Sequence, residues 1–250
     1  LETMFTSIRS FFLASDLVSR EGFRVFVEPY FSRYKGIYSL AWVPKVNYAQ
    51  RQAFEKEAAK SFPGFIIRQL NSQKALVSSD PKDVYYPLLY SEPMSTQEKI
   101  LGFDISSAPG RLPALILARD EKRFAASSRI SIFYEGEAGF GILCFLPVFK
   151  GISPDEIKNL QGFVGGLFFI GSMYEGAISN LARQTIRVRI DDISEVNEIG
   201  DKSLLYHTSN FNNAANFEYS DLISTARLSL GGRSWQLTAR PAAEFIAANR

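Results

Sequence analysis

Two long apolar segments joined by a short turn constrain the fold of this chain most. Residues 125–134 and 139–149 are both rich in aliphatic and aromatic residues, as expected of strands. The intervening sequence, Glu135-Gly136-Glu137-Ala138, is short and contains a glycine, which is typical of a hairpin connection. Strands joined by a hairpin pair antiparallel, so we predict an antiparallel sheet.

Helices and strands alternate around this hairpin in the first part of the chain. Helical spacing of apolar residues predicts helices over residues 23–34 (with Pro29 inside), 50–62 and 111–123. Strands are predicted over residues 37–46, 65–70 and 84–90, with a short extended piece at 100–104. Helices combined with an antiparallel sheet indicate an α+β fold.

A second set of elements follows an interruption at residues 150–155, where Gly151, Ser153 and Pro154 break the pattern. We expect a short helix over residues 172–182 and strands over 163–170, 186–190, 204–207, 222–230 and 235–239. The predicted organisation is a helix over residues 1–20 and two tandem α+β units, at 21–152 and 153–250.

The first residues have an apolar spacing that suggests a helical stalk. Leu1, Met4, Ile8 and Phe11 follow a heptad-like repeat from position 1, with no capping residue before them. We therefore expect a segment excised from a longer protein, with more helix upstream. The alternative is an ordinary first helix that packs on the core.

Composition excludes several classes of function. The 28 basic and 26 acidic residues nearly balance, unlike the basic excess of nucleic-acid-binding proteins. Cys144 is the only cysteine, which rules out an internal disulfide and a cysteine zinc site. His207 is the only histidine, and no phosphate-binding loop or HExxH motif is present. We therefore predict no catalytic residues, no metal and no cofactor.

No apolar run is long enough to cross a bilayer. The longest, residues 138–149 and 162–170, fall short of the roughly 20 residues that a membrane-spanning helix needs. Both runs also contain glycine or proline, so we interpret them as buried strands.

Several short motifs follow one another along the chain. They are Trp42-Val43-Pro44, Arg51, Phe54, Tyr86-Pro87, Leu101-Gly102-Phe103-Asp104, Arg111, Ala118, Pro147-Val148-Phe149, Gly162-Phe163-Val164-Gly165-Gly166 and Gly232-Arg233-Ser234-Trp235. Their order and spacing resemble the CHASE family, the cyclase/histidine-kinase-associated sensory extracellular domains. The resemblance extends from about Phe23 to the end of the chain, and no single motif is diagnostic.

The resemblance implies a long N-terminal helix and two PAS-like units, of which the membrane-distal one holds a small-molecule ligand. It implies flanking transmembrane helices, a position on the periplasmic or extracellular face of the cell membrane, and dimerisation through the N-terminal helix. The output of the parent protein would be a histidine kinase or a nucleotide or diguanylate cyclase. In plant members the ligand is a cytokinin, an N6-substituted adenine, and those members carry cysteines that this chain lacks.

Asp104 is the first candidate for ligand contact, because the matching aspartate of the plant receptors binds the adenine. A buried carboxylate suits a ligand with amine-type donors. Asp104 also precedes Ser106 and Ser107 and lies near Arg111, so it could instead cap a turn or pair with that arginine. Ala126 matches a second, backbone-mediated contact of the plant members.

Aromatic and apolar residues near these positions are candidate pocket walls, because ligand cavities are mostly apolar with few polar anchors. They are Trp42, Tyr86, Leu88, Tyr90, Phe103 and Phe145. Each of them would serve equally well as plain core. Arg111 belongs to a basic group, and this group could either receive an anionic ligand or form a solvated helix face. Its other members are Arg119, Lys122, Arg123 and Arg129.

We therefore predict a small-molecule sensor domain of a transmembrane receptor, with ligand identity left open between a cytokinin-like adenine and other small organic molecules. Ligand binding would shift the packing of the stalk helix and bias a two-state dimer. One alternative is a periplasmic protein-interaction or structural module with a vestigial pocket, which a large exposed apolar patch would favour. A hydrolase is a third possibility, supported by no motif.

Overall fold

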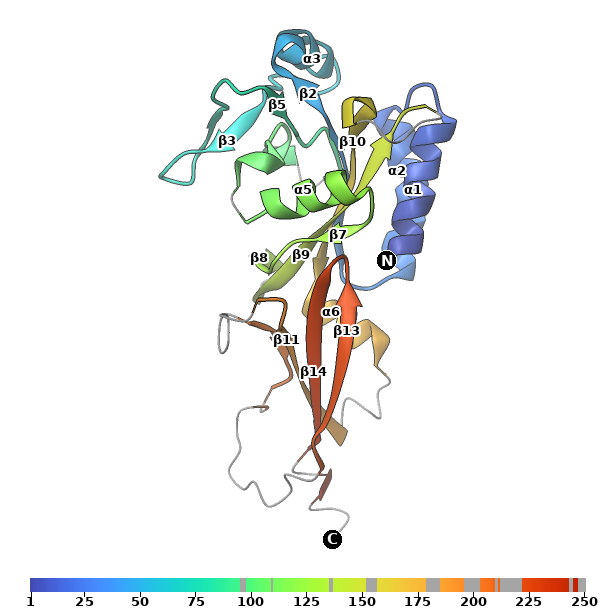
Figure 1. Cartoon of the computed structure of the whole chain (residues 1–250), viewed down its shortest axis with the longest axis vertical. Coiled ribbons are helices and arrows are strands. Elements are labelled where there is room, and N and C mark those ends of the chain that lie inside the picture. The colour runs from blue at the N-terminus through green and yellow to red at the C-terminus, as the bar shows by residue number, and fades with distance from the viewer. Residues whose placement is uncertain are drawn as a thin grey trace.

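The two larger sheets of the chain are antiparallel and lie end to end, with helices packed on the first (Figure 1). This computed structural model describes residues 1–94, 98–108, 110–134, 137–151, 157–178, 185–195, 203–209, 211, 222–242 and 245–246. The predicted mixture of helices and antiparallel strands is confirmed. The helices are α1 (Glu2–Ala14), α2 (Arg20–Arg33), α3 (Arg51–Ala58), α5 (Leu112–Glu121) and α6 (Ile170–Ala177).

The first sheet has the strand order β6-β1-β10-β9-β7, and β8 also pairs with β9. Every neighbouring pair in it is antiparallel. The predicted hairpin is confirmed by the pairing of β8 with β9, although its turn residues 135 and 136 lie outside the described residues. The strands are β1 (Ile37–Pro44), β6 (Tyr90–Glu92), β7 (Ala125–Ala126), β8 (Ile130–Tyr134), β9 (Glu137–Phe149) and β10 (Leu160–Phe169).

Strand β10 corrects the predicted boundary at 152/153. Residues 163–170 were assigned to the second unit, but β10 lies between β1 and β9 in the first sheet. The glycine and proline residues at 150–155 suggested a linker between units. They instead fall between two neighbouring strands of one sheet. The prediction of a linker was wrong because connections between adjacent strands are as rich in glycine and proline as linkers between domains. Residues 152–156 themselves lie outside the described residues.

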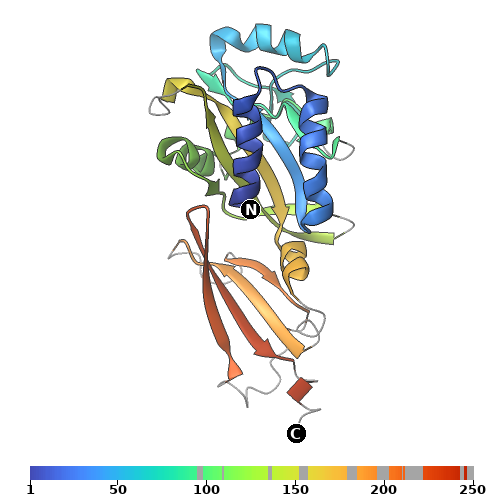
Figure 2. The same ribbon diagram turned by 90° about the vertical axis from the view of Figure 1, so that its right-hand side faces the viewer.

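The N-terminal segment forms two helices, as the predicted ranges 1–20 and 23–34 imply, but the first helix is shorter than predicted. α1 ends at Ala14, and α2 begins after Ser19, whose hydroxyl accepts a hydrogen bond from the Gly22 amide at 3.1 Å. The two helices lie side by side over one face of the first sheet (Figure 2). Met4 and Ile8, which suggested a dimerising heptad, are buried against that sheet, so this part of the apolar stripe is used within the chain.

The segment between β1 and α5 covers the opposite face of the first sheet. The strand predicted over residues 84–90 divides into β5 (Val84–Tyr85) and β6, because Pro87 interrupts the backbone pairing. The extended piece at 100–104 makes only isolated bridges, in which Phe103 pairs with Arg68 and Asp104 with Pro87. Short pairs β2 (Val46–Asn47) with β5 and β3 (Arg68–Leu70) with β4 (Leu76–Ser78) complete this region.

The second sheet has the order β12-β11-β14-β13 and is antiparallel throughout. Its strands are β11 (Ile186–Asp192), β12 (Leu204–His207), β13 (Ser224–Leu230) and β14 (Arg233–Pro241), close to their predicted ranges. The predicted helix 172–182 is α6, and residues 179–182 lie outside the described residues.

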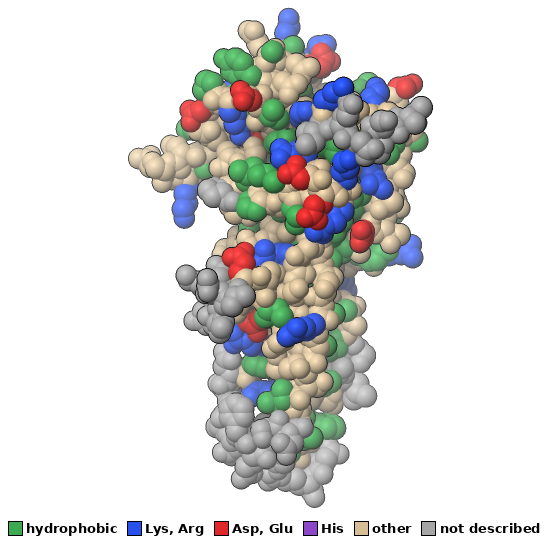
Figure 3. All heavy atoms as spheres, in the orientation of Figure 1, with side chains coloured by type: hydrophobic (Ala, Val, Ile, Leu, Met, Phe, Trp, Pro, Cys, Tyr) green, Lys and Arg blue, Asp and Glu red, His purple; other side chains and the backbone are tan. Residues whose placement is uncertain are grey.

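The turn between β13 and β14 joins the two sheets. The Ala126 amide of β7 donates a hydrogen bond to the Gly231 carbonyl at 2.9 Å. A space-filling view shows a wide upper body above a narrower lower part (Figure 3). Within the described residues, no helix combines the length and apolar content required to span a bilayer.

Candidate ligand-binding site

The large sheet has one cross-strand row made mostly of small side chains. Residues that are paired across antiparallel strands point to the same face. The register therefore aligns four residues from β6, β1, β10 and β9, namely Ser91, Ala41, Gly165 and Phe145. The side chains of Ser91, Ala41 and Gly165 are short or absent. They therefore leave space above this row of the sheet, between neighbouring rows with larger side chains.

A partly enclosed cavity of about 80 Å³ lies over this row. Its walls are mostly apolar, as expected of a small-molecule site. The sheet contributes Ser39, Ala41, Val43, Ser91, Ile130, Leu143, Phe145, Gly165, Gly166 and Leu167. The opposite wall comes from the segment between β5 and α5 and contributes Leu88, Ile100, Phe103, Ile105 and Arg111.

Among the described residues of the cavity wall, Arg111 is the charged one. It immediately precedes α5, and its guanidinium carbon lies 4.9 Å from the centroid of the Phe103 ring, in cation–π contact. The side chain is half-buried, and this desolvation lowers the pKa of Arg111. No acidic residue is among the described residues that line the cavity.

Ser91 is the second polar feature of the cavity wall. Its side chain is 1% exposed, and its hydroxyl has no hydrogen-bond partner among the described residues. A buried hydroxyl without a partner is unfavourable, because burial removes its water without replacing the hydrogen bonds. The site therefore offers an unused hydroxyl and a partly desolvated cation.

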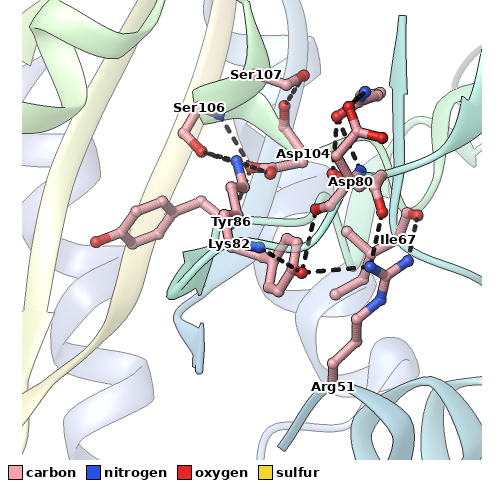
Figure 4. Close-up of polar contacts among 11 residues, drawn as sticks. Arg51, Ile67, Asp80, Lys82, Tyr86, Asp104, Ser106 and Ser107 are labelled. Carbon is pink, nitrogen blue, oxygen red and sulfur yellow. Dashed lines mark hydrogen bonds and ion pairs between the residues drawn. The ribbon is translucent and has the colours of Figure 1, made fainter. Parts of the chain in front are cut away.

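Asp104 is fully buried, but it bonds to protein groups rather than lining the cavity (Figure 4). Its Oδ1 accepts hydrogen bonds from the Tyr86 amide at 3.0 Å, the Ser106 amide at 3.1 Å and the Ser106 hydroxyl at 2.7 Å. Its second oxygen forms an ion pair with Lys82. The suggested turn cap is thus present, and the partner of the carboxylate is Lys82, not Arg111.

Four of the nine predicted ligand-binding residues line the cavity: Leu88, Phe103, Phe145 and Arg111. Trp42 and Tyr90 point to the other face, where Trp42 stacks on Phe12 at 4.1 Å between ring centroids. Each lies next to a cavity-lining residue, Trp42 beside Ala41 and Tyr90 beside Ser91. Successive side chains of a strand point to opposite faces, and both aromatic side chains belong to the apolar cluster on the face away from the cavity.

Tyr86 and Ala126 are buried away from the cavity wall. The ring of Tyr86 packs edge-on against Phe163, with centroids 5.4 Å apart, and its burial raises the pKa of the phenol. The backbone amide of Ala126 is bonded to Gly231 in the second sheet. The resemblance suggested a backbone contact with ligand at Ala126, and the amide is the one of its two backbone groups that this bond uses.

The cavity residues that sequence reasoning missed are either small (Ser, Ala, Gly) or aliphatic (Val, Ile, Leu). Ser39, Ala41 and Val43 alternate along β1, so the period of two signalled a common face. The register that places Gly165 and Ser91 beside Ala41 depends on pairing between distant segments, and nothing local in the sequence shows it.

The predicted basic group does not act as one unit. Arg119 pairs with Asp120 at 2.6 Å, and Arg123 pairs with Glu121. Basic and acidic side chains are interspersed on the face drawn in Figure 3. Arg111 is the member that lines the cavity, and Arg129 bonds to the Leu204 carbonyl of β12.

The Arg51 side chain, part of the motif series, has a structural role near this region (Figure 4). Its guanidinium donates to the Ser79 carbonyl at 2.7 Å, contacts the Tyr85 ring and pairs with Glu55 at 2.9 Å. These contacts tie α3 to the strands beside it.

The fold is similar to that of two solved proteins. The chain resembles the extracellular ligand binding receptor from Desulfohalobium retbaense with a TM-score of 0.50 and 12% identity, over 95% of this chain and 36% of that one. It resembles the periplasmic sensory domain of the Campylobacter jejuni chemoreceptor Tlp1 with the same score and identity, over 98% and 87% of the two chains.

The family is given by the sequence. Residues 16–206 match the CHASE domain, so the chain belongs to the CHASE domain family, whose members are sensory modules. It is 25% identical over 242 residues to hybrid signal transduction histidine kinase A of Dictyostelium discoideum. It is 22% identical over 165 residues to probable histidine kinase 6 of Oryza sativa subsp. japonica. The matches cover 84% and 64% of this chain but only 11% and 16% of those relatives.

Proposed function

We propose that the chain is the non-catalytic, extracytoplasmic sensor of a longer signalling protein, and that it binds a small organic molecule in the cavity over the first sheet. The observation that carries this proposal is a mostly apolar cavity of about 80 Å³ with an unpartnered buried hydroxyl and a cation in its wall. Membership of the CHASE family and the fold of sensory domains support it.

The size of the cavity favours a ligand smaller than a cytokinin. An engineered apolar cavity of about 150 Å³ holds one benzene ring, and this one has about half that volume. An adenine with a further substituent would require the walls to move apart. A small molecule with few non-hydrogen atoms fits the cavity as it stands.

Helix α5 offers a route from the cavity to the second sheet. Arg111, which immediately precedes the helix, lines the cavity. On the same helix, Leu117 lies against Gly232, in the turn between β13 and β14. A ligand that shifts Arg111 would move α5 against this turn, provided that it binds the two positions of the helix with different affinity. In this proposal the first sheet is the membrane-distal unit and the second sheet the membrane-proximal unit.

For the whole protein, we propose a membrane receptor with a histidine kinase output. This choice over a diguanylate cyclase rests on the names of the two relatives and on the small share of their length that the chain spans. Dimerisation through the N-terminal helix stays a prediction. Because Met4 and Ile8 pack on the sheet, an interface on α1 would use its other faces.

A protein-interaction module with a vestigial pocket is the alternative function. A vestigial pocket tends to fill with side chains and to lose its unpaired polar groups. The open cavity and the unpartnered Ser91 hydroxyl favour the ligand-binding proposal.

Thermal-shift screening against small organic molecules, with a cavity-filling variant alongside, tests the proposal. An alanine Cβ at Gly165 would lie 3.5–3.7 Å from Val43, Ala41 and Phe145, all cavity walls, so Gly165→Ala fills space without a clash. A cavity ligand should raise the melting temperature of the wild type more than that of Gly165→Ala. Gly110→Ala, whose added methyl meets no atom within 4 Å, is the control and should respond like the wild type. Equal shifts for all three proteins would contradict binding in this cavity.

A further inference from the structure

The cavity has the charge of a site for an anion. Its described walls contain one cation and no carboxylate. The other two arginines in and just after α5 differ from Arg111, because Arg119 and Arg123 each pair with a neighbouring acid. Among the described residues, the Arg111 guanidinium contacts the Phe103 ring and forms no ion pair. The Arg111 guanidinium is therefore available to form an ion pair with a ligand that enters the cavity.

The Ser91 hydroxyl supplies an independent indication. It is 1% exposed, lines the same cavity and has no hydrogen-bond partner among the described residues. A hydroxyl donates one hydrogen bond and accepts others, and an oxygen atom of a ligand would satisfy the donor. Ser91 and Arg111 both line this cavity, and because the Ser91 hydroxyl has almost no accessible surface, a ligand would reach it after a small rotation of that side chain.

We infer that the ligand is a small aliphatic carboxylate whose oxygens accept hydrogen bonds from Arg111 and Ser91. This inference rests on the proposed function and adds the chemical class of the ligand. Arginine suits the role because its planar donors match the two carboxylate oxygens. The short apolar part of the ligand contacts Val43, Leu88 and Phe145. The volume fits acetate or propionate, which are smaller than the benzene ring that fills about twice this space.

Isothermal titration of the folded chain with sodium propionate tests the inference. Propionamide and propylamine hydrochloride are the neutral and cationic probes of similar shape, and sodium chloride keeps the ionic strength constant. We expect propionate to bind and the other two to bind at least about tenfold more weakly, since hydrogen bonds to charged groups contribute more than neutral ones.

Substitutions then assign the groups. Arg111→Met keeps the length and the apolar stem of the side chain and should weaken propionate binding about ten- to a hundredfold. Ser91→Ala should weaken it by a smaller factor. Arg119→Met removes an arginine of the same helix that does not line the cavity, and its affinity for propionate should equal that of the wild type. Circular dichroism confirms that each variant is folded.

Three results would overturn the inference. If propionamide or propylamine binds as tightly as propionate and loses affinity in Gly165→Ala, the cavity is a ligand site for another chemical class, and the proposed function stands. Equal loss in Arg111→Met and Arg119→Met would place the carboxylate elsewhere. Failure of acetate and propionate to bind at all would exclude the carboxylate class, whereas the proposed function fails only if the wider screen finds no cavity ligand.

Discussion

The Asp104 carboxylate accepts a hydrogen bond from the Tyr86 amide at 3.0 Å and so joins two segments of the cavity wall that lie 18 residues apart. Leu88 lies two residues after Tyr86, and Phe103 directly precedes Asp104. Both Leu88 and Phe103 line the cavity. The carboxylate is fully buried and also paired with Lys82. Asp104 therefore holds the two wall segments in position without itself lining the cavity.

Asp104→Ala is expected to destabilise the fold by about 3–5 kcal/mol, because it leaves the Tyr86 amide, Ser106 and the Lys82 ammonium without their partner. Asp104→Asn keeps an acceptor oxygen and should cost less. Urea unfolding followed by circular dichroism measures both. Asp120→Ala, which breaks a surface pair with Arg119, is the control and should change stability little. Equal stability of Asp104→Ala and wild type would contradict this structural role.

Gly231 is expected to be essential for the contact between the two sheets. Its φ is +55°, and an added Cβ would lie 2.5 Å from the Ala126 nitrogen, so Gly231→Ala meets both backbone strain and a backbone clash. The matched control is Gly232→Ala, with φ +83° but only flexible side-chain ends of Leu117 and Arg123 nearby.

The control should therefore show only the left-handed backbone penalty, about 1–2 kcal/mol, and Gly231→Ala should lose more. Hydrogen exchange gives a second readout, because the Ala126 amide donates to Gly231. It should exchange faster in Gly231→Ala than in Gly232→Ala. Similar protection of this amide in both variants would show that the turn does not hold the sheets together.

The sequence was most informative where the periodicity of side chains is local. Alternation over residues 186–190 predicted β11, and the apolar spacing of residues 112–116 predicted α5. Pairing between distant segments was not readable. β10 was assigned to the wrong unit because the sequence of a strand does not indicate which strands pair with it. Only the register with Ala41 and Phe145 places Gly165 in the first sheet.

The same distinction explains the site. Bulky and charged residues stood out in the sequence, and four of them do line the cavity. The space itself is made by side chains that are absent or short, at Gly165, Ala41 and Ser91, and a hollow becomes visible only after the strands are paired. Trp42 was chosen for its size, but its place beside Ala41 in β1 turns it to the face that packs against α1.

Gly166 is expected to control the docking of α1. An added Cβ at this position would lie 2.9 Å from the Phe5 ring and 2.9 Å from the Phe168 ring, both fully buried. Gly166→Ala should therefore push α1 outward, since well-packed cores do not absorb an extra methyl group without strain. We expect a loss of about 1–3 kcal/mol and faster amide exchange in residues 5–12.

Gly165→Ala is the control on the opposite face of the same strand, where the added Cβ finds ordinary contacts at 3.5–3.7 Å. It should not destabilise the fold, and exchange within α1 should be unchanged. Equal exchange in α1 for the two variants would mean that the helix position does not depend on close approach to β10.

The stability of the fold is expected to fall at alkaline pH because of Cys144. This thiol is completely buried in β9, and burial raises its pKa. In the unfolded chain a cysteine ionises near pH 8.5, so above that pH the unfolded state binds fewer protons than the folded state and becomes relatively more stable. The contribution is absent below about pH 8 and grows as the pH rises.

Urea unfolding at pH 7.5 and 9.5, with a phosphine reductant present, measures the effect in wild type and Cys144→Ala. The wild type should lose about 1 kcal/mol more than the variant between these two pH values. The phenols of buried Tyr86 and partly buried Tyr90, whose pKa values are raised as well, are common to both proteins and cancel in the comparison. An identical pH dependence of the two proteins would show that the Cys144 thiol ionises as readily in the folded chain as in the unfolded one.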